Sequence, residues 1–345
     1  MDYQLLGRSG LRVSQLCLGA MTFGSDEAWC ADEAESRAMF DAFANAGGNF
    51  IDTADIYTGG ESERLVGDFI RSDRERFVLA TKYTNALPGL DDPNAAGNHR
   101  KNLTQSLDAS LKRLGVDYID LYWVHVWDYT TPVDEVVRAL DDAVSAGKIL
   151  YAGLSDAPAW VAARANTIAE LRGWTPFVTM QLEYSLLQRG IEREHVSLCR
   201  SMDMAITAWS PLASGILSGK YTRAVDESKR LDTQSGLHSL SDASLETARV
   251  VDGIADELGV SSAQVALAWV RQRGTIPIIG ARTLAQLEDN LASVSLTLSE
   301  SQMDTLTAAS AFELGHPYDF LDNELVKAIA YGGMYDRIHN HRPLR

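Results

Sequence analysis

Cysteine is scarce in this chain of 345 residues, and the few that occur form no recognisable pattern. Cys17, Cys30 and Cys199 are odd in number, widely spaced and without a CxxC pair. Such usage argues against a disulfide framework and is typical of reduced, mostly buried thiols in a cytoplasm. The chain also lacks an apolar run of the ~20 residues that cross a bilayer, and its N-terminus lacks the basic and apolar segments of a secretory signal. We therefore expect a cytoplasmic protein that does not enter a membrane.

Basic residues are in deficit, with 31 lysines and arginines against 47 aspartates and glutamates and a formal net charge of −16. The overall field of such a chain repels polyanions, which makes nucleic acid and anionic membranes poor candidate partners. No HExxH motif and no cluster of histidines and cysteines occurs, so we expect no metal. A small-molecule ligand remains, which a local basic pocket could hold even if it were phosphorylated. A homo-oligomer is left open.

What the sequence does contain is a repeated alternation of short apolar runs and helical patterns, without a linker or a low-complexity segment. The candidate strands are Ser14–Leu18, Asn49–Asp52, Phe77–Thr81, Ile119–His125, Ile149–Leu154, Val178–Leu182, Ala205–Trp209 and Thr275–Ile279. The candidate helices include Ala31–Ala46, Asn98–Leu114, Thr131–Ala146, Pro158–Arg172, Glu192–Met202 and Leu245–Leu258. Near-continuous apolar runs are typical of parallel strands that are covered on both faces. Eight such units predict one domain over residues 1–345, with the α/β fold of a (β/α)8 TIM barrel.

Two segments lie outside the repeated units. Tyr3–Leu6 and Leu11–Val13 flank Gly10 and predict an N-terminal β-hairpin that closes the barrel floor. Residues 311–345 follow the eighth unit and are expected to form a C-terminal extension of loops and helix. Within it, Tyr331-Gly-Gly-Met-Tyr335 could cap the site or mediate contact between copies of the chain.

In a barrel of this type the active residues lie at the carboxyl ends of the strands, and four polar residues meet that condition. Asp52, Lys82 and His125 close three successive strands, and Tyr57 follows Asp52 in the next loop. Together they suit carbonyl reduction, which needs an acid that gives up a proton as a hydride arrives. A nearby ammonium such as Lys82 favours the phenolate and lowers the pKa of a tyrosine, and Asp52 would keep Lys82 charged and in place. His125 could donate a hydrogen bond that orients the carbonyl oxygen.

Each of these residues also has an ordinary explanation. Asp52 and Lys82 could form a structural ion pair, and His125 could be a buried histidine with satisfied hydrogen bonds. Tyr57 could be one more loop aromatic. A lysine at a strand end would also suit a Schiff-base aldolase with Lys82 as the nucleophile. The combination is more specific than any single member, because all four positions agree with one mechanism.

At these residues the sequence resembles the aldo-keto reductase family, from Leu18-Gly-Ala-Met-Thr-Phe-Gly24 to Asn290. Phe50-Ile-Asp-Thr-Ala-Asp-Ile-Tyr57 followed by Gly60-Glu-Ser-Glu63 is similar to the family signature, as is Trp209-Ser-Pro-Leu-Ala-Ser-Gly-Ile-Leu-Ser-Gly-Lys220. The resemblance implies an oxidoreductase that reduces an aldehyde or ketone to the alcohol, or the reverse. The implied catalytic tetrad is Asp52, Tyr57, Lys82 and His125, with Tyr57 as the general acid/base. The subgroup looks like the bacterial and potassium-channel-β-like branch, which keeps a regulatory subunit with little turnover as an alternative.

A dinucleotide would have to be held without the Rossmann fingerprint, because no GxGxxG occurs. Gly215-Ile-Leu-Ser-Gly219-Lys220 fails as a Walker A motif, since its glycines are too close and no Ser or Thr follows its lysine. After the last strand, Thr283 and Gln286 predict a capping box that opens a helix. Free N–H groups at that N-terminus, with Arg282 beside them, could bind a phosphate, and Gln286 and Asn290 share a helix face that could meet an adenine. A plain capped surface helix is the alternative.

The resemblance implies NADP(H) as the cofactor, with the 2′-phosphate at Arg282 and the adenosine against Gln286 and Asn290. It also implies that Ser155 and Gln181 hold the nicotinamide carboxamide. The full implied set of cofactor contacts is Gly19, Met21, Thr22, Asp52, Ser155, Gln181, Trp209, Ser210, Pro211, Leu212, Gly215, Leu217, Lys220, Gly280, Arg282, Gln286 and Asn290, with Trp209 stacked on the nicotinamide ring. In one place the chain departs from the pattern: relatives commonly carry Ser-Asn where this sequence has Ser155-Asp156.

The substrate is the least determined part of the prediction. Candidate walls of its pocket are Trp29, Tyr83, Trp127 and Tyr129, which would suit aromatic aldehydes, ketones or the apolar faces of sugars. Each of these side chains could equally pack beneath a loop.

Overall fold

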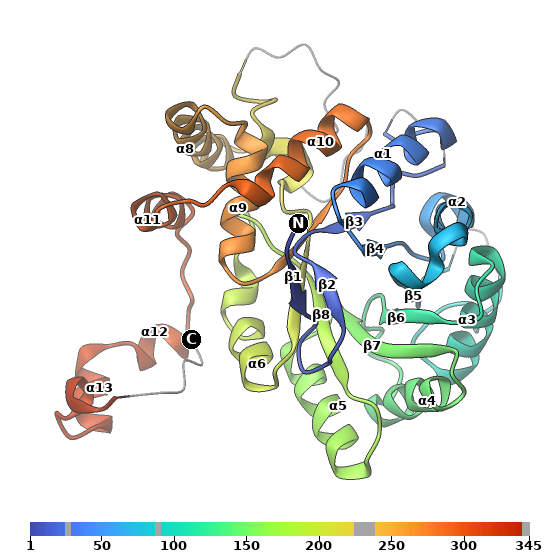
Figure 1. The fold of residues 1–345 in the computed structure, drawn as a ribbon. Coiled ribbons are helices and arrows are strands. Elements are labelled where there is room, and N and C mark those ends of the chain that lie inside the picture. The colour runs from blue at the N-terminus through green and yellow to red at the C-terminus, as the bar shows by residue number, and fades with distance from the viewer. Residues whose placement is uncertain (25–28, 87–90, 224–238, 340–345) are drawn as a thin grey trace.

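The computed structural model describes residues 1–24, 29–86, 91–223 and 239–339. Eight parallel strands close into a barrel in the order β10-β3-β4-β5-β6-β7-β8-β9 (Figure 1). The strands are β3 (Cys17–Gly19), β4 (Phe50–Asp52), β5 (Val78–Tyr83), β6 (Ile119–Val124), β7 (Ile149–Ser155), β8 (Phe177–Glu183), β9 (Ala205–Trp209) and β10 (Ile276–Ile279). The predicted (β/α)8 TIM barrel is thereby confirmed. The largest shift in a strand bound is at the first strand, where Ser14 belongs to the hairpin instead.

The N-terminal hairpin is also present. Strand β1 (Tyr3–Leu5) pairs antiparallel with β2 (Arg12–Ser14). Leu6 and Val13 are fully buried and pack with the side chains that fill the barrel interior. The hairpin therefore covers the end of the barrel away from the carboxyl ends of the strands.

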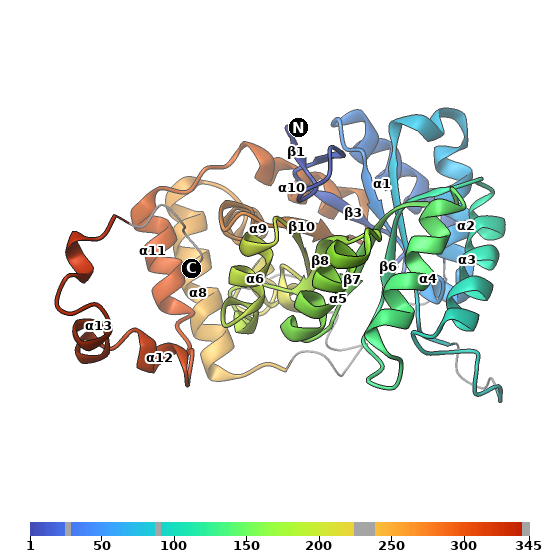
Figure 2. The ribbon, with the colours of Figure 1, turned by 90° about the horizontal axis from the view of Figure 1, so that it is seen from below.

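Helices surround the barrel, as the view in Figure 2 also shows. They are α1 (Glu33–Asn45), α2 (Glu61–Ile70), α3 (Arg100–Leu114), α4 (Val133–Ser145), α5 (Ala159–Arg172), α6 (His195–Ser201), α8 (Asp242–Leu258), α9 (Ser262–Gln272), α10 (Leu284–Ala292) and α11 (Glu300–Ala309). Helices α2, α9 and α11 are missing from the predicted set. In α9 the residues from Val265 to Val270 are all buried, so the sequence shows no periodic polar face there.

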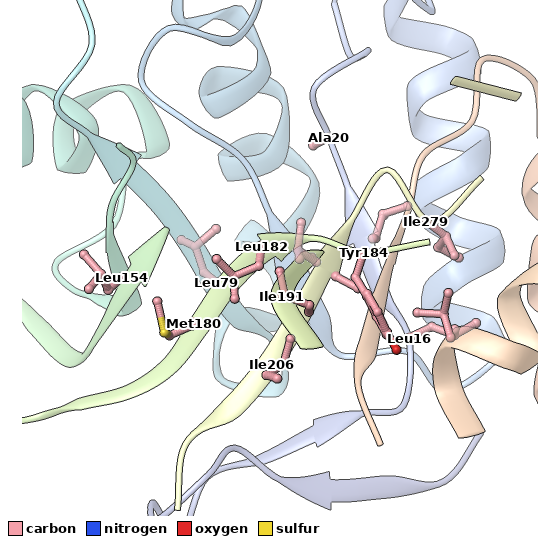
Figure 3. Close-up of a cluster of buried hydrophobic side chains, with 14 of the residues drawn as sticks. Leu16, Ala20, Leu79, Leu154, Met180, Leu182, Tyr184, Ile191, Ile206 and Ile279 are labelled. Atoms are coloured by element: carbon pink, nitrogen blue, oxygen red, sulfur yellow. The ribbon is translucent and has the colours of Figure 1, made fainter. Parts of the chain in front are cut away.

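The hydrophobic core has two layers that follow from the alternation of side chains along a strand. Phe50, Val78, Leu121 and Ile276 point inward and meet in the barrel interior. Their strand neighbours point outward and pack against the helices. Figure 3 shows part of this outer layer, with Leu79 of β5 among its buried side chains.

The C-terminal extension is packed far less than the barrel. Helices α12 (Tyr318–Leu321) and α13 (Glu324–Ala330) contain no buried residue. Both views show these two helices projecting away from the barrel (Figures 1 and 2). Residues 340–345 of the expected tail lie outside the described residues. Within the described ranges, no helix combines the length and the apolar composition needed to span a membrane.

Candidate active site

The inward face of three neighbouring strands changes from apolar to polar toward their carboxyl ends. Phe50 on β4, Ala80 on β5 and Trp123 on β6 belong to the apolar barrel interior. Two residues further along the chain, and hence toward the same face, come Asp52 on β4, Lys82 on β5 and His125 directly after the end of β6. Because β4 pairs with β5 and β5 with β6, the three polar side chains meet at one side of the barrel mouth.

Lys82 is the centre of this group, and its side chain is completely buried. Its ammonium donates to Asp52 Oδ2 at 2.5 Å, to the carbonyl oxygen of Thr53 at 2.8 Å and to the Tyr57 hydroxyl oxygen at 3.0 Å. An ammonium has three hydrogens, so these contacts use all of them. Since the Tyr57 oxygen accepts from Lys82, the hydroxyl hydrogen of Tyr57 must point to another acceptor.

The second oxygen of Asp52 is held as well. Gln181, on β8, donates from Nε2 to Asp52 Oδ1 at 3.0 Å. Both carboxylate oxygens therefore have a partner, as a charge in this buried position requires. Gln181, predicted as a cofactor contact, therefore also holds Asp52, a predicted catalytic residue.

The pKa values of this cluster show two opposing effects. Burial acts to lower the pKa of Lys82, but Asp52 and Tyr57 raise it, and the net direction is upward, so Lys82 remains charged. Burial raises the pKa of Tyr57, Lys82 lowers it, and the net direction is above the ordinary value. A neighbouring ammonium such as Lys82 is expected to lower this pKa. The contribution of Lys82 has that sign, but the loss of hydration of the phenolate outweighs it.

His125 lies beside Tyr57, with ring centroids 5.9 Å apart and the rings nearly perpendicular. Asn85 Nδ2 lies 3.1 Å from His125 Nδ1. An amide nitrogen only donates, so Nδ1 accepts and the ring hydrogen is on Nε2. Burial, and then the charge of Lys82, lower the pKa of His125 to about 3. The imidazole is thus neutral and has one N–H to offer from Nε2.

The loop that carries Tyr57 is fixed by its own hydrogen bonds. Thr58, at φ 47°, donates from Oγ1 to the carbonyl oxygen of Phe23 at 2.8 Å and accepts from the Ser62 N–H at 3.0 Å. The Ser62 hydroxyl donates to the Ala20 carbonyl oxygen at 2.7 Å. Glu63 is fully buried and pairs with Arg113. The Gly60-Glu-Ser-Glu63 motif therefore anchors the loop of Tyr57 to neighbouring segments through Ser62 and Glu63.

A cavity of about 1100 Å³ opens above the tetrad. It is lined by Asp52, Tyr57 and His125, and it reaches the loops after β9 and β10, which lie across the barrel from β5 and β6. The predicted cofactor contacts that line it are Gly19, Met21, Thr22, Asp52, Gln181, Trp209, Ser210, Pro211, Leu212, Gly215, Lys220, Gly280, Arg282, Gln286 and Asn290. The other two, Ser155 and Leu217, are buried and do not line it.

The N-terminus of α10 differs from the predicted capping box. The Thr283 hydroxyl accepts from the Gln286 N–H at 3.3 Å, but the Gln286 side chain accepts from the Arg282 N–H at 3.1 Å and not from the cap residue. Glu35 of α1 accepts from the Leu284 N–H at 2.5 Å. Some of the backbone N–H groups that were expected to bind a phosphate therefore already have partners within the protein. One of them, that of Leu284, donates to a carboxylate from the distant helix α1.

Of the four predicted substrate walls, only Trp29 lines the cavity. Tyr83 follows the inward-facing Lys82, so it points outward, where its buried ring stacks on Tyr122 at 5.3 Å between centroids. Trp127 is buried in the outer core, and Tyr129 is 71% exposed at φ 57°. Strand alternation and the turn after β6 decide these placements.

Sequence reasoning missed some residues that line the cavity. Asn85 is the most consequential, because it sets the tautomer of His125. Its place three residues after Lys82, beyond the strand end, was the available signal. The cavity also includes Cys30, Ile56, Ser214, Ser218, Ala263, Leu267, Ile278, Ile279, Ala281, Thr283, Ala285 and Asp289. Among the residues that the structure describes, no group of histidine, cysteine and acidic side chains is arranged to hold a metal ion.

Comparison with known proteins agrees with this geometry. The model of the aldo/keto reductase family matches residues 15–311. Norsolorinic acid reductase of Aspergillus flavus is 38% identical over 333 residues, which cover 92% of this chain and 83% of that protein. Norsolorinic acid reductase B of Dothistroma septosporum is 36% identical, covering 93% of this chain and 84% of its own. Aryl-alcohol dehydrogenase [NADP(+)] of Phanerodontia chrysosporium is 34% identical, covering 97% and 92%.

These relatives bear on the subgroup expected from the sequence. They are fungal proteins named for the reduction of norsolorinic acid or the oxidation of aryl alcohols. The expected bacterial and potassium-channel-β-like branch is therefore not supported.

Proposed function

Since the chain belongs to the aldo/keto reductase family, we propose that it is an NADP(H)-dependent oxidoreductase that interconverts an aldehyde or ketone and the corresponding alcohol. One observation carries the proposal: Tyr57 lines the cavity while its hydroxyl oxygen accepts from the buried Lys82 ammonium. Tyr57 is then the general acid in reduction and the general base in oxidation.

The residues around the cavity fit a phosphorylated dinucleotide. Lys220 and Arg282 bring two cations to the cavity in a chain with a formal net charge of −16. At Gly280 a Cβ would meet no atom within 4 Å, so a ligand can approach the backbone closely there. Arg282 would hold the 2′-phosphate, Gln286 and Asn290 the adenosine, and Trp209 the nicotinamide ring.

The bound cofactor supplies a hydride to the carbonyl carbon, so that carbonyl, NADPH and one proton give alcohol and NADP⁺. The proton comes from Tyr57, whose O–H points away from Lys82 and toward the carbonyl oxygen. The Lys82 ammonium stabilises the phenolate that remains until it is reprotonated. His125, neutral and with its hydrogen on Nε2, donates a second hydrogen bond to the same oxygen and orients it.

The substrate we propose is an aryl aldehyde or ketone, or the matching alcohol. Trp29 lines the cavity and offers a flat apolar surface to an aromatic ring. The printed name of the Phanerodontia chrysosporium relative supports the same class. A cytoplasmic location is part of the proposal, supported by the three free cysteines, of which Cys17 and Cys199 are buried.

The aldolase alternative is disfavoured by Lys82 itself. A Schiff-base lysine must reach the substrate as a free amine. Lys82 is completely buried, its pKa is raised, and its three hydrogens are all donated within the protein. These features suit a permanent cation and not a nucleophile.

The proposed function is tested by incubating the purified protein with NADPH and a panel of aliphatic and aryl aldehydes and ketones, while the absorbance of reduced nicotinamide is followed. Oxidation of NADPH that depends on an aryl carbonyl is the expected result. Cofactor binding without turnover of any carbonyl would instead favour a regulatory role, and substrate trapped on Lys82 by borohydride would favour the aldolase.

A further inference from the structure

Asp156 is a carboxylate inside the cavity that the proposed mechanism does not use. It follows directly after the end of β7 and lines the cavity together with Trp209. Its backbone is in the left-handed region at φ 40°, which costs most side chains energy and which Asp and Asn tolerate better than most. The indole Nε1–H of Trp209 donates to Asp156 Oδ1 at 3.0 Å. The strained backbone thus places a carboxylate where it holds an aromatic ring at the cavity wall.

This carboxylate is also close to the reacting groups. The Asp156 N–H donates to the Gln181 carbonyl oxygen at 3.2 Å, and the Gln181 side chain donates to Asp52. The negative charge of Asp156 contributes to the raised pKa of Tyr57, so its field reaches the phenol. A ring that delivers a hydride beside Tyr57 must therefore lie within the field of Asp156.

The charged groups that act on Asp156 come from two other strands. Asp156 is exposed to the cavity, but the surrounding cavity walls reduce its hydration and raise its pKa to about 6. The Trp209 N–H lowers this pKa, Glu183 of β8 raises it, and the Ser155 hydroxyl and Lys82 of β5 lower it. With that balance Asp156 is ionised at neutral pH.

We propose that the Asp156 carboxylate is a positioning residue that fixes the Trp209 indole against the nicotinamide and makes this pocket favour the oxidised cofactor. The inference rests on the proposed function, because it requires that nicotinamide binds here. The reduced ring is neutral and the oxidised ring carries a positive charge, so a fixed negative charge beside it stabilises the oxidised form selectively. The same charge assists hydride departure during carbonyl reduction and slows the release of NADP⁺.

The test compares the affinities of the intact protein for NADP⁺ and NADPH, measured by calorimetry at neutral pH without substrate. Asp156→Asn keeps the shape, the tolerance of the backbone and an acceptor for Trp209, but removes the charge. We expect this substitution to weaken the binding of NADP⁺ by about 5- to 20-fold relative to the binding of NADPH. Asp289→Asn, a charge removed from another part of the cavity lining, should leave the ratio of the two affinities unchanged.

A second variant separates the effect of the Asp156 charge from the effect of its hydrogen bond with Trp209. Trp209→Phe removes the N–H donor and keeps the carboxylate, so both affinities should fall while their ratio, measured at about pH 8.5 where the carboxylate stays ionised without that donor, remains within about twofold. An unchanged ratio in Asp156→Asn would overturn the inference. So would a ratio that collapses in Trp209→Phe, which also decides the matter if the Asp156 variant does not fold. If the wild-type protein bound neither cofactor, the proposed function itself would fail.

Discussion

The two sides of the barrel mouth are built in different ways. On the side of β4, β5 and β6, charged groups are buried and their hydrogen-bonding capacity is used within the protein, as for Lys82 and Asp52. On the side of β9 and β10, cations such as Arg282 are only half-buried. Proton transfer needs fixed geometry, whereas a cofactor that binds and leaves needs groups that solvent can reach.

The clearest test of the first side removes the proton donor. Tyr57→Phe should lower carbonyl turnover by at least about 100-fold, because general acid catalysis typically contributes that much or more. Cofactor affinity, measured by fluorescence titration, should stay nearly the same, since the phenol oxygen is not among the groups proposed to hold the cofactor.

The matched control is Tyr129→Phe, which removes a hydroxyl from an exposed side chain outside the cavity. It should leave turnover unchanged. Retained activity in Tyr57→Phe would refute the assignment of the acid.

The second side is tested at Arg282. Arg282→Ala should weaken the binding of NADPH by about 10- to 150-fold, because one charge-assisted contact to the 2′-phosphate is worth about 1.5–3 kcal/mol. The binding of NADH, which has no 2′-phosphate, should weaken much less. Turnover at saturating NADPH should change little. The measurement is the affinity for each cofactor.

Arg164→Ala, on the exposed face of α5, is the control and should affect neither cofactor. Equal losses of NADPH and NADH in Arg282→Ala would contradict a role in binding the 2′-phosphate.

A smaller effect is expected at Asp55, a carboxylate near β4 whose hydrogen bonding is incomplete. Asp55 Oδ1 is buried without a hydrogen-bond partner among the described residues, and burial, followed by the charge of Glu63, raises the pKa of Asp55 to about 7. A raised pKa means that the folded protein binds this proton more tightly than the unfolded chain does. The protonated carboxyl of Asp55 therefore contributes stability that is fully present below about pH 4 and is lost as pH rises through about 7. Asp55→Asn should therefore stabilise the protein by about 1–2 kcal/mol at pH 8 and hardly at pH 4, with the amide oxygen still unsatisfied.

Denaturant unfolding at the two pH values measures this difference. Asp304→Asn, at an exposed position of α11, provides the comparison for a carboxylate in solvent. A gain of equal size at both pH values would show that the charge of Asp55 is not the cause.

The smallest effect is expected beyond both sides, in the C-terminal extension. Deletion of residues 323–345 should change the free energy of unfolding by less than about 0.5 kcal/mol, since none of the described residues there is buried. Thermal unfolding and turnover measure the result. Lost activity would show that the tail caps the site, and an altered mass in solution would show that it joins two copies.

Much of the catalytic side could be predicted from local sequence. A run such as Leu79-Ala-Thr-Lys82 places a polar residue at the end of a buried strand, and the barrel rule then brings such residues together. The aromatic walls could not be predicted in this way. Tyr83 is adjacent to Lys82 in sequence, yet the pleat of the strand sends it to the other face of the sheet.

The sequence by itself determined the barrel and which residues gather at its mouth, namely the four proposed catalytic residues and most of the proposed cofactor contacts, because each depends on a local pattern repeated at strand ends. Only the tertiary structure decided the hydrogen-bond partners. Three of these hydrogen bonds join segments that lie far apart in the chain: Gln181 with Asp52, Asn85 with His125, and Glu35 with the start of α10. The direction of the Tyr57 pKa was decided in the same way, because burial is a property of the packed molecule and not of the residue beside it.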